Sequence, residues 1–222
     1  MIHSLPRWVE YGAFILAFLA GCINAIGLLG FQHQSISHLS GTATLLGTDL
    51  LSFNETSLDL VLVLVSFLLG SMVSGFLLSG TSVKLGRHYD SLLIIEAALL
   101  FAAVYFLSNK IAIGHYLASA ACGLQNALAT RYSGAVIRTT HLTGIFTDLG
   151  IMLGAALKKE PFDNRKAILF LLIIFGFILG GTLGAYLFHT ISFKALLVPA
   201  ISCIVLGFCY RVYWQQTLNK KI

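Results

Sequence analysis

The chain contains one sequence block twice, and this duplication constrains its architecture more than any other feature. The first copy runs from His38 to Gly47, and the second runs from His141 to Gly150, at a constant spacing of 103 residues. The copies share His, Leu, a small hydroxyl residue, Gly, Thr and Gly in register. A chance match of this length is improbable, so the chain is expected to be built from two related halves.

The similarity extends beyond the block on both sides. Corresponding residues are Gly21 and Asn24 with Gly123 and Asn126, and Phe67 and Gly70 with Phe177 and Gly180. We therefore interpret the chain as two repeats, 1–108 and 109–222, that form one domain. Internal repeats of this kind are typical of transporter architectures.

The composition indicates that the chain is surrounded by lipid rather than by water. The 222 residues are 57% hydrophobic and 10% charged, with a mean hydropathy of +0.87. Soluble domains carry about 25% charged residues, so this composition predicts an integral membrane protein with the lipid bilayer as its partner. The net charge is +5, and the Lys and Arg residues lie at segment ends rather than on one helical face. This distribution argues against nucleic acid as a partner.

The apolar segments predict helices. About 20 residues are needed to cross the hydrocarbon core. Six segments meet that length approximately: 11–31, 58–80, 91–107, 111–130, 167–188 and 193–214. The two His blocks, 38–52 and 139–157, are shorter and rich in Gly, Ser and Thr, so they fit half-crossings better.

The distribution of cations distinguishes two topologies. If all eight segments crossed with the N-terminus inside, nine of the 14 Lys and Arg residues would be inside. If the His blocks are re-entrant, twelve are inside, and only Lys110 and Lys194 are outside. The positive-inside bias favours the second arrangement, with six spans and both termini cytoplasmic.

This topology implies an inverted repeat. Three spans in each half reverse the orientation of the second half, so the two re-entrant half-helices would enter from opposite faces. Such 3+3 repeats with broken helices place a site near the bilayer midplane. The free N–H groups and positive dipole end of a half-helix favour an anion or polar group there.

The same residues resemble a known family. Gly21, Asn24, the two His blocks and Glu96-Ala97 are similar to bacterial YoaK-type membrane proteins, over nearly the whole chain. That family is a domain of unknown function with six spans. The resemblance implies a multi-pass protein of the bacterial inner membrane and implies no particular substrate.

Candidate solute-binding residues are the polar and glycine positions of the two blocks and the paired amides. They are His38, Ser40, Gly41, Thr44, Asn24, His141, Thr143, Gly144, Thr147 and Asn126. Capping of the half-helices is the favoured role of the two His residues, with solute contact or proton relay second. The hydroxyls line a polar path or bond back to their own helix, and the amides join helices or brace the half-helices. No Cys, Asp or third His stands at ligand spacing from the His pair, so neither a metal nor another cofactor is expected.

Two carboxylates are candidates for proton coupling. Glu96 lies within an apolar span, where a carboxylate costs about 2.5–3.5 kcal/mol on insertion scales. Its alternative role is a structural hydrogen bond to a neighbouring helix. Asp148 lies in the second His block, and its alternative is an interfacial carboxylate stabilised by Arg131 or Arg138.

Glycine ladders indicate close helix packing. Gly176, Gly180 and Gly184 recur at every fourth position, as do Ser66, Gly70 and Ser74 in the first half. Small residues at this spacing let helix backbones approach each other. They mark either the seam between the repeats or the face of a homodimer.

Three function classes follow. A channel or secondary transporter for a small polar or anionic solute is favoured by the repeat, the paired blocks and Glu96. An enzyme is not expected, because the chain has no nucleophile elbow and no HExxH motif. A scaffold or assembly factor without flux is the alternative, and it leaves the carboxylates inside the membrane unexplained.

Overall fold

The fold was analysed in a computed structural model that describes residues 8–31, 36–52, 54–78, 88–133 and 138–219. Within these residues the chain is helical and has no strand, which confirms the all-helical expectation. The elements are α1 (Trp8–Gly30), α2 (Leu39–Asp49), η2 (Leu50–Ser52), α3 (Glu55–Leu77), α4 (Tyr89–Ser108), α5 (Ile113–Tyr132), α6 (Leu142–Leu157), α7 (Asn164–Ile191), η3 (Ser192–Leu196) and α8 (Leu197–Asn219).

Membrane-spanning helices are evident from length and hydropathy. Four described segments are long and apolar enough to cross: Val9–Gly30, Glu55–Leu77, Tyr89–Ser108 and Asn164–Thr217, the last of which includes both α7 and α8. The outer surface is apolar as well. On α3 the small residues Gly70 and Ser74 are buried, whereas Leu68, Met72 and Phe76 are 66%, 60% and 86% exposed. This inside-out distribution confirms a membrane protein, because an apolar exterior is stable only against lipid.

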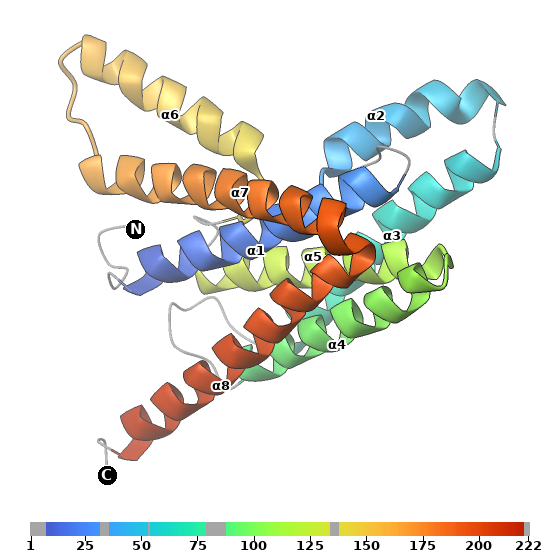
Figure 1. The fold of residues 1–222 in the computed structure, drawn as a ribbon. Helices are drawn as coiled ribbons and strands as arrows, with labels where there is room; N and C mark the ends of the chain where they lie inside the picture. Colours follow the sequence, from blue (N-terminus) through green and yellow to red (C-terminus); the bar gives the residue numbers. More distant parts are fainter. Residues whose placement is uncertain (1–7, 32–35, 53, 79–87, 134–137, 220–222) are drawn as a thin grey trace.

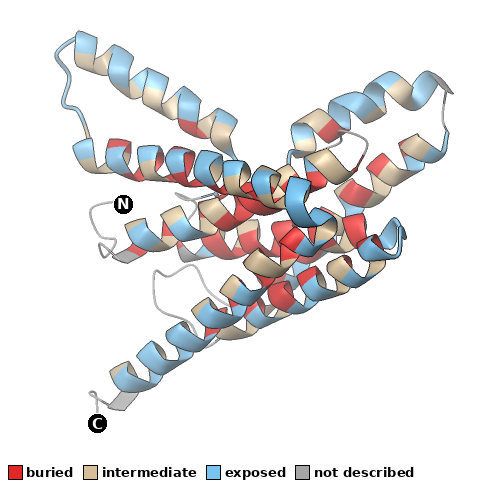
Figure 2. Cartoon of the chain, viewed as in Figure 1, coloured by how far each residue is buried: buried red, intermediate tan, exposed pale blue. Residues whose placement is uncertain are grey.

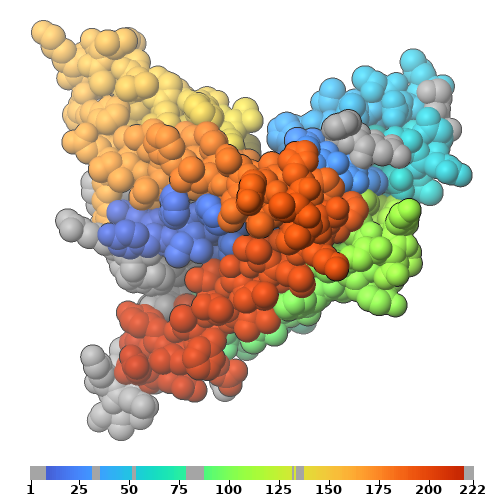
Figure 3. All heavy atoms as spheres, viewed as in Figure 1, coloured from blue at the N-terminus to red at the C-terminus, as the bar shows by residue number. Residues whose placement is uncertain are grey.

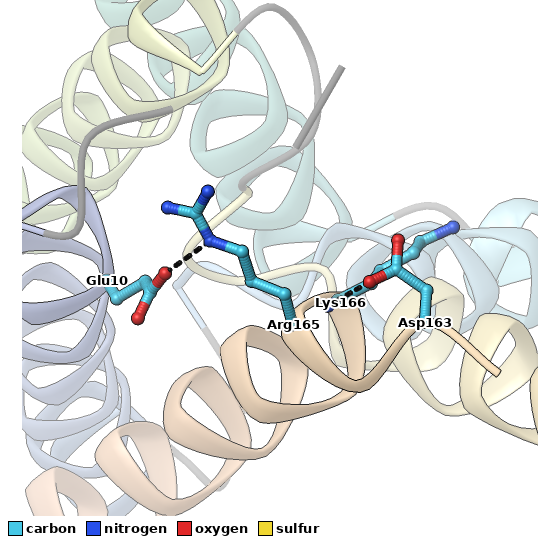
Figure 4. Close-up of polar contacts among 4 residues, drawn as sticks. All are labelled: Glu10, Asp163, Arg165 and Lys166. Atoms are coloured by element: carbon cyan, nitrogen blue, oxygen red, sulfur yellow. Dashed lines mark hydrogen bonds and ion pairs between the residues drawn. The ribbon is translucent and has the colours of Figure 1, made fainter. Parts of the chain in front are cut away.

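Polar caps fix where two of the long helices begin. Asn54 caps α3: its Oδ1 accepts from the Ser57 N–H at 3.1 Å, and the Ser57 hydroxyl accepts from the Asn54 N–H at 3.2 Å. Asp163 caps α7 by accepting from the Lys166 N–H at 3.0 Å (Figure 4). In the same region Arg165 donates to Glu10 at 2.8 Å, which joins the start of α7 to the start of α1.

The helices pack mainly in pairs drawn from opposite halves of the sequence. α1 packs along α7, α3 packs along α5, and α4 contacts both α5 and α8 (Figure 1). α1 begins and α8 ends on the left of this view. The long pairs therefore join the first half of the chain to the second.

The glycine ladders lie in these seams. A Cβ built on Gly180 would lie against the carbonyl of Phe18, and one on Gly21 would lie against the carbonyl of Phe177. The same pattern occurs between α3 and α5. There Gly70 faces the Ala120 carbonyl and Gly123 faces the Phe67 carbonyl. These glycines thus serve packing within the chain, where a backbone meets a backbone with no room for a side chain.

The short helices α2 and α6 are arranged differently from the long ones. Each begins near the centre of the molecule and runs outward, and the two diverge (Figure 1). Their surfaces are mostly exposed or half-buried (Figure 2), and in the space-filling view they form two lobes with a notch between them (Figure 3). Exposed apolar side chains on these helices include Leu45, Phe146, Ile151 and Leu157. α2 packs against α3 and α6 against α7.

Candidate functional site

A cavity of about 960 Å³ brings the two His blocks together. α3, α5 and the starts of α2 and α6 contribute its lining. The bordering residues are Ser37, His38, Leu39, Ser40, Phe67, Ser71, Gly75, Asn126, Ala127, Thr130, Arg131, Arg138, Thr140, His141 and Thr143. Five predicted residues therefore meet at one cavity although they are distant in sequence: His38, Ser40, Asn126, His141 and Thr143.

His38 and His141 occupy the N-cap positions of α2 and α6, as their place ahead of each block suggested. Within the described residues, neither imidazole caps its helix through the side chain. The contact of each residue with its helix is made by the backbone instead, because the carbonyls of His38 and His141 accept the first helical bonds, from Thr42 at 3.2 Å and Ile145 at 3.3 Å. The rings remain at the cavity border.

Gly41 and Gly144 give these rings their space. A Cβ built on Gly41 would lie 2.7 Å from Nδ1 of His38, and one on Gly144 would overlap the ring of His141. Each imidazole thus folds over the third residue of its helix. Ser40 lies 3.2 Å from Nε2 of His38, so the serine hydroxyl and the imidazole form a hydrogen-bonded pair. The role of the two glycines is to admit the ring, and neither borders the cavity itself.

The paired amides brace the segments that lead into α2 and α6. Ser37 donates to Oδ1 of Asn24 at 2.6 Å, and Thr139 donates to Oδ1 of Asn126 at 3.5 Å. In each half the hydroxyl stands 13 residues after the amide. Asn24 and Asn126 therefore fix the chain just ahead of α2 and α6 against α1 and α5. Asn126 also borders the cavity, whereas Asn24 does not.

Thr44 and Thr147 do not face the cavity. Their hydroxyls donate to the carbonyls one turn earlier, Ser40 at 2.8 Å and Thr143 at 2.9 Å. Back-bonding of this kind satisfies a hydroxyl within its own helix. Of the two roles considered for these threonines, the structure supports the local one.

Glu96 is fully buried between α4, α5 and α8, away from the cavity. Its Oε1 accepts from Nε2 of Gln125 at 2.9 Å. The thiol of Cys203 lies beside the same carboxyl group. Among the described residues, Oε2 has no partner with hydrogen-bond geometry. The structure thus shows the interhelical hydrogen bond that the sequence offered as one of two roles.

Asp148 also lies outside the cavity lining. Its carboxylate is 3.7 Å from Nζ of Lys166 on α7, so its partner is neither Arg131 nor Arg138. Those two arginines border the cavity instead. This difference follows from the outward course of α6, which directs Asp148 toward the first turn of α7.

Sequence reasoning missed several cavity residues. The sequence presents Arg131 and Arg138 as possible partners of Asp148, and it places Phe67, Ser71 and Thr130 within apolar spans. The two arginines could have been predicted from the sequence, because they stand on either side of the polar connection that leads into the His141 block. The contribution of α3 had no signal in sequence, since it depends on the packing of α3 against α5.

Comparisons with known proteins give one result. Residues 12–209 match the family described as "Protein of unknown function (DUF1275)". No curated protein and no solved structure matches the chain. The match covers most of the chain, including both His blocks and every described residue that borders the cavity, and the chain therefore belongs to the DUF1275 family.

Proposed function

We propose that the protein is a membrane channel or secondary transporter for a small polar or anionic solute. The observation that carries this proposal is the single cavity bordered by the starts of both His blocks. A pocket of this volume lies within the range of small-molecule sites, about 300–1,000 Å³. In a protein whose outer surface is apolar, the polar side chains at the border of such a cavity need water or a solute as hydrogen-bond partners.

The proposed topology has six spans, α1, α3, α4, α5, α7 and α8, with α2 and α6 as re-entrant half-helices. Matched contacts in the two halves support a 3+3 inverted repeat: the Gly21–Phe177 contact corresponds to the Gly123–Phe67 contact. The divergence of α2 and α6 supports entry from opposite faces (Figure 1). The cation distribution favours cytoplasmic termini. The resemblance to YoaK-type proteins favours the bacterial inner membrane.

The binding site in this proposal uses the half-helix starts. The first N–H groups of a helix have no partner within the helix, and its dipole makes that end positive. Ser40 and Thr143 stand in the first turns of α2 and α6 and border the cavity. A solute there would meet donors from two helices, two imidazoles and the amide of Asn126.

Proton coupling, where present, would act through helix contacts rather than through direct contact of Glu96 with the solute. Glu96 on α4 accepts from Gln125 on α5, and the next residue, Asn126, borders the cavity. A change in protonation of Glu96 would alter this hydrogen bond and so bias the position of α5. Asp148 remains a second candidate through its ion pair with Lys166.

The test is flux in proteoliposomes under a pH gradient, with small anions, amides and nucleobase-like solutes as the panel. His141→Ala and Asn126→Ala are expected to reduce flux of the accepted solute about tenfold or more, since each removes a cavity donor or acceptor. His189→Ala is the matched control, because His189 is exposed on α7 outside the cavity.

The absence of flux across the whole panel with folded protein would reject permeation. Flux that His189→Ala reduces as strongly as His141→Ala would reject the cavity as the route. Unchanged behaviour of the cavity variants in cells would then favour the alternative, a non-transporting scaffold whose partner is another membrane protein.

A further inference from the structure

We infer that the ligand of this cavity is a small organic anion, and that Arg131 and Arg138 select it by charge. The inference rests on the proposed function for the location of the site, and it adds the ligand class and two binding residues. It is carried by the charge, volume and wall chemistry of the cavity together.

The cavity lining is cationic. Arg131, at the end of α5, and Arg138, ahead of α6, both border it, and none of the described bordering residues is Asp or Glu. A cleft with charges of one sign and low-dielectric walls concentrates counter-ions. Arginine remains charged at every physiological pH, so these two side chains disfavour a cationic solute at this border.

The arginines also favour a particular anionic group. A guanidinium presents five N–H donors in a planar fork that matches the two oxygens of a carboxylate or phosphate. Asn126, Ser40 and Thr143 add neutral donors along the border. The chemistry at this border therefore suits an oxyanion.

Volume and walls separate an organic anion from an inorganic ion. The cavity of about 960 Å³ is far larger than a chloride or phosphate ion, since one water takes about 30 Å³ of liquid volume. Leu39, Phe67 and Ala127 provide apolar wall beside the charged residues. A ligand with an oxyanion and an apolar body would use both parts, whereas an inorganic ion would leave the apolar wall in contact with water.

The experiment measures binding to the full-length protein in phosphatidylcholine nanodiscs by calorimetry. The probes are benzoate, its neutral counterpart benzamide, the cation benzylamine, inorganic phosphate and chloride. We expect binding of benzoate and no measurable binding of benzamide or benzylamine. Arg131→Gln and Arg138→Gln are each expected to weaken benzoate binding about tenfold, because each removes a charge-assisted donor.

The matched control is Lys158→Gln, which removes an exposed cation at the end of α6, away from the cavity. It should leave benzoate affinity unchanged. Arg131→Lys retains the charge without the fork, so an intermediate affinity is expected. Because Arg131→Lys keeps the charge, it separates the effect of lost charge from that of lost folding. Thermal unfolding without ligand shows whether each variant is folded.

Other outcomes overturn the inference. Equal binding of benzoate and benzamide would exclude selection by charge, and stronger binding of chloride or phosphate than of benzoate would assign the site to an inorganic ion. Competition by phosphatidylglycerol added to the nanodiscs would assign the charge to a lipid headgroup. Arginine-dependent benzoate binding without flux would keep the inference and reject permeation. Flux of a neutral amide without any anion binding would reject the inference and keep the proposed function.

Discussion

Glu96 shows how a single buried residue serves the fold of this protein. Its carboxyl lies at the junction of three helices, with Gln125 from α5 donating to it and Cys203 from α8 beside it. A buried donor that loses its acceptor costs about 1–3 kcal/mol. Removing the Glu96 side chain therefore costs more than its own hydrogen bond, because the Gln125 amide is left unpaired.

This leads to a prediction about two substitutions at the same site. Glu96→Ala is expected to lower the free energy of unfolding by about 2–4 kcal/mol, through the unpaired amide and the cavity that it creates. Glu96→Gln keeps an acceptor oxygen for Gln125 and should cost less than about 1 kcal/mol. Thermal unfolding in detergent measures both.

The same pair of variants distinguishes a structural role of Glu96 from a role in proton coupling. A Glu96→Gln protein as unstable as Glu96→Ala would show that the charge itself holds the helices. A stable Glu96→Gln protein that binds solute but no longer responds to a pH gradient would support a proton-carrying role.

Helices in this chain are joined by two seams of the same construction. α7 meets α1 through Gly176, Gly180 and Gly184, and α3 meets α5 through Gly70 and Gly123. Close backbone approach lets dispersion forces hold helices together in lipid, where the hydrophobic effect gives little net attraction. α2 and α6 differ from these long helices, because Gly47, Gly150 and Gly154 have no neighbour within 4 Å of a built Cβ and most of the surface of both helices is exposed or half-buried (Figure 2).

We predict that Gly180→Ala and Gly70→Ala each destabilise the protein by about 1–3 kcal/mol, because the new methyl group would overlap a carbonyl of the partner helix. Gly154→Ala on α6 is the control, since a Cβ there has nothing within 4 Å. It should be neutral or stabilise by up to about 1 kcal/mol through helix propensity. Chemical or thermal unfolding gives the ranking, and equal effects at Gly180 and Gly154 would contradict the seam.

Over the whole molecule, the proposed topology predicts on which face of the membrane each connecting segment lies. The segments near Arg87 and Arg138 belong on the cytoplasmic face and Lys110 on the opposite face. The bias of cations toward the cytoplasm gives the physical reason. A topology with eight full crossings would instead place Arg87 outside the cell and Lys110 on the cytoplasmic face.

Single cysteines at positions 87, 110 and 138 test this arrangement with an impermeant maleimide applied to intact cells. Labelling is expected at position 110 alone, with positions 87 and 138 labelled only after permeabilisation. The background has Cys209 replaced by Ser, because this thiol is exposed, whereas Cys22, Cys122 and Cys203 are buried. Labelling of 87 and 138 from opposite faces would exclude six spans.

The sequence by itself determined the helical class, the membrane environment and the family, because hydropathy and residue period are local properties that survive any packing. It also determined which residues recur, and so brought His38 and His141 forward as candidates. Tertiary structure alone decided that Arg131, Arg138 and Phe67 border the same cavity, and that Glu96, Thr44 and Thr147 do not. Those assignments depend on which helix faces which, and α1 with α7 and α3 with α5 are pairs formed between residues far apart in the chain.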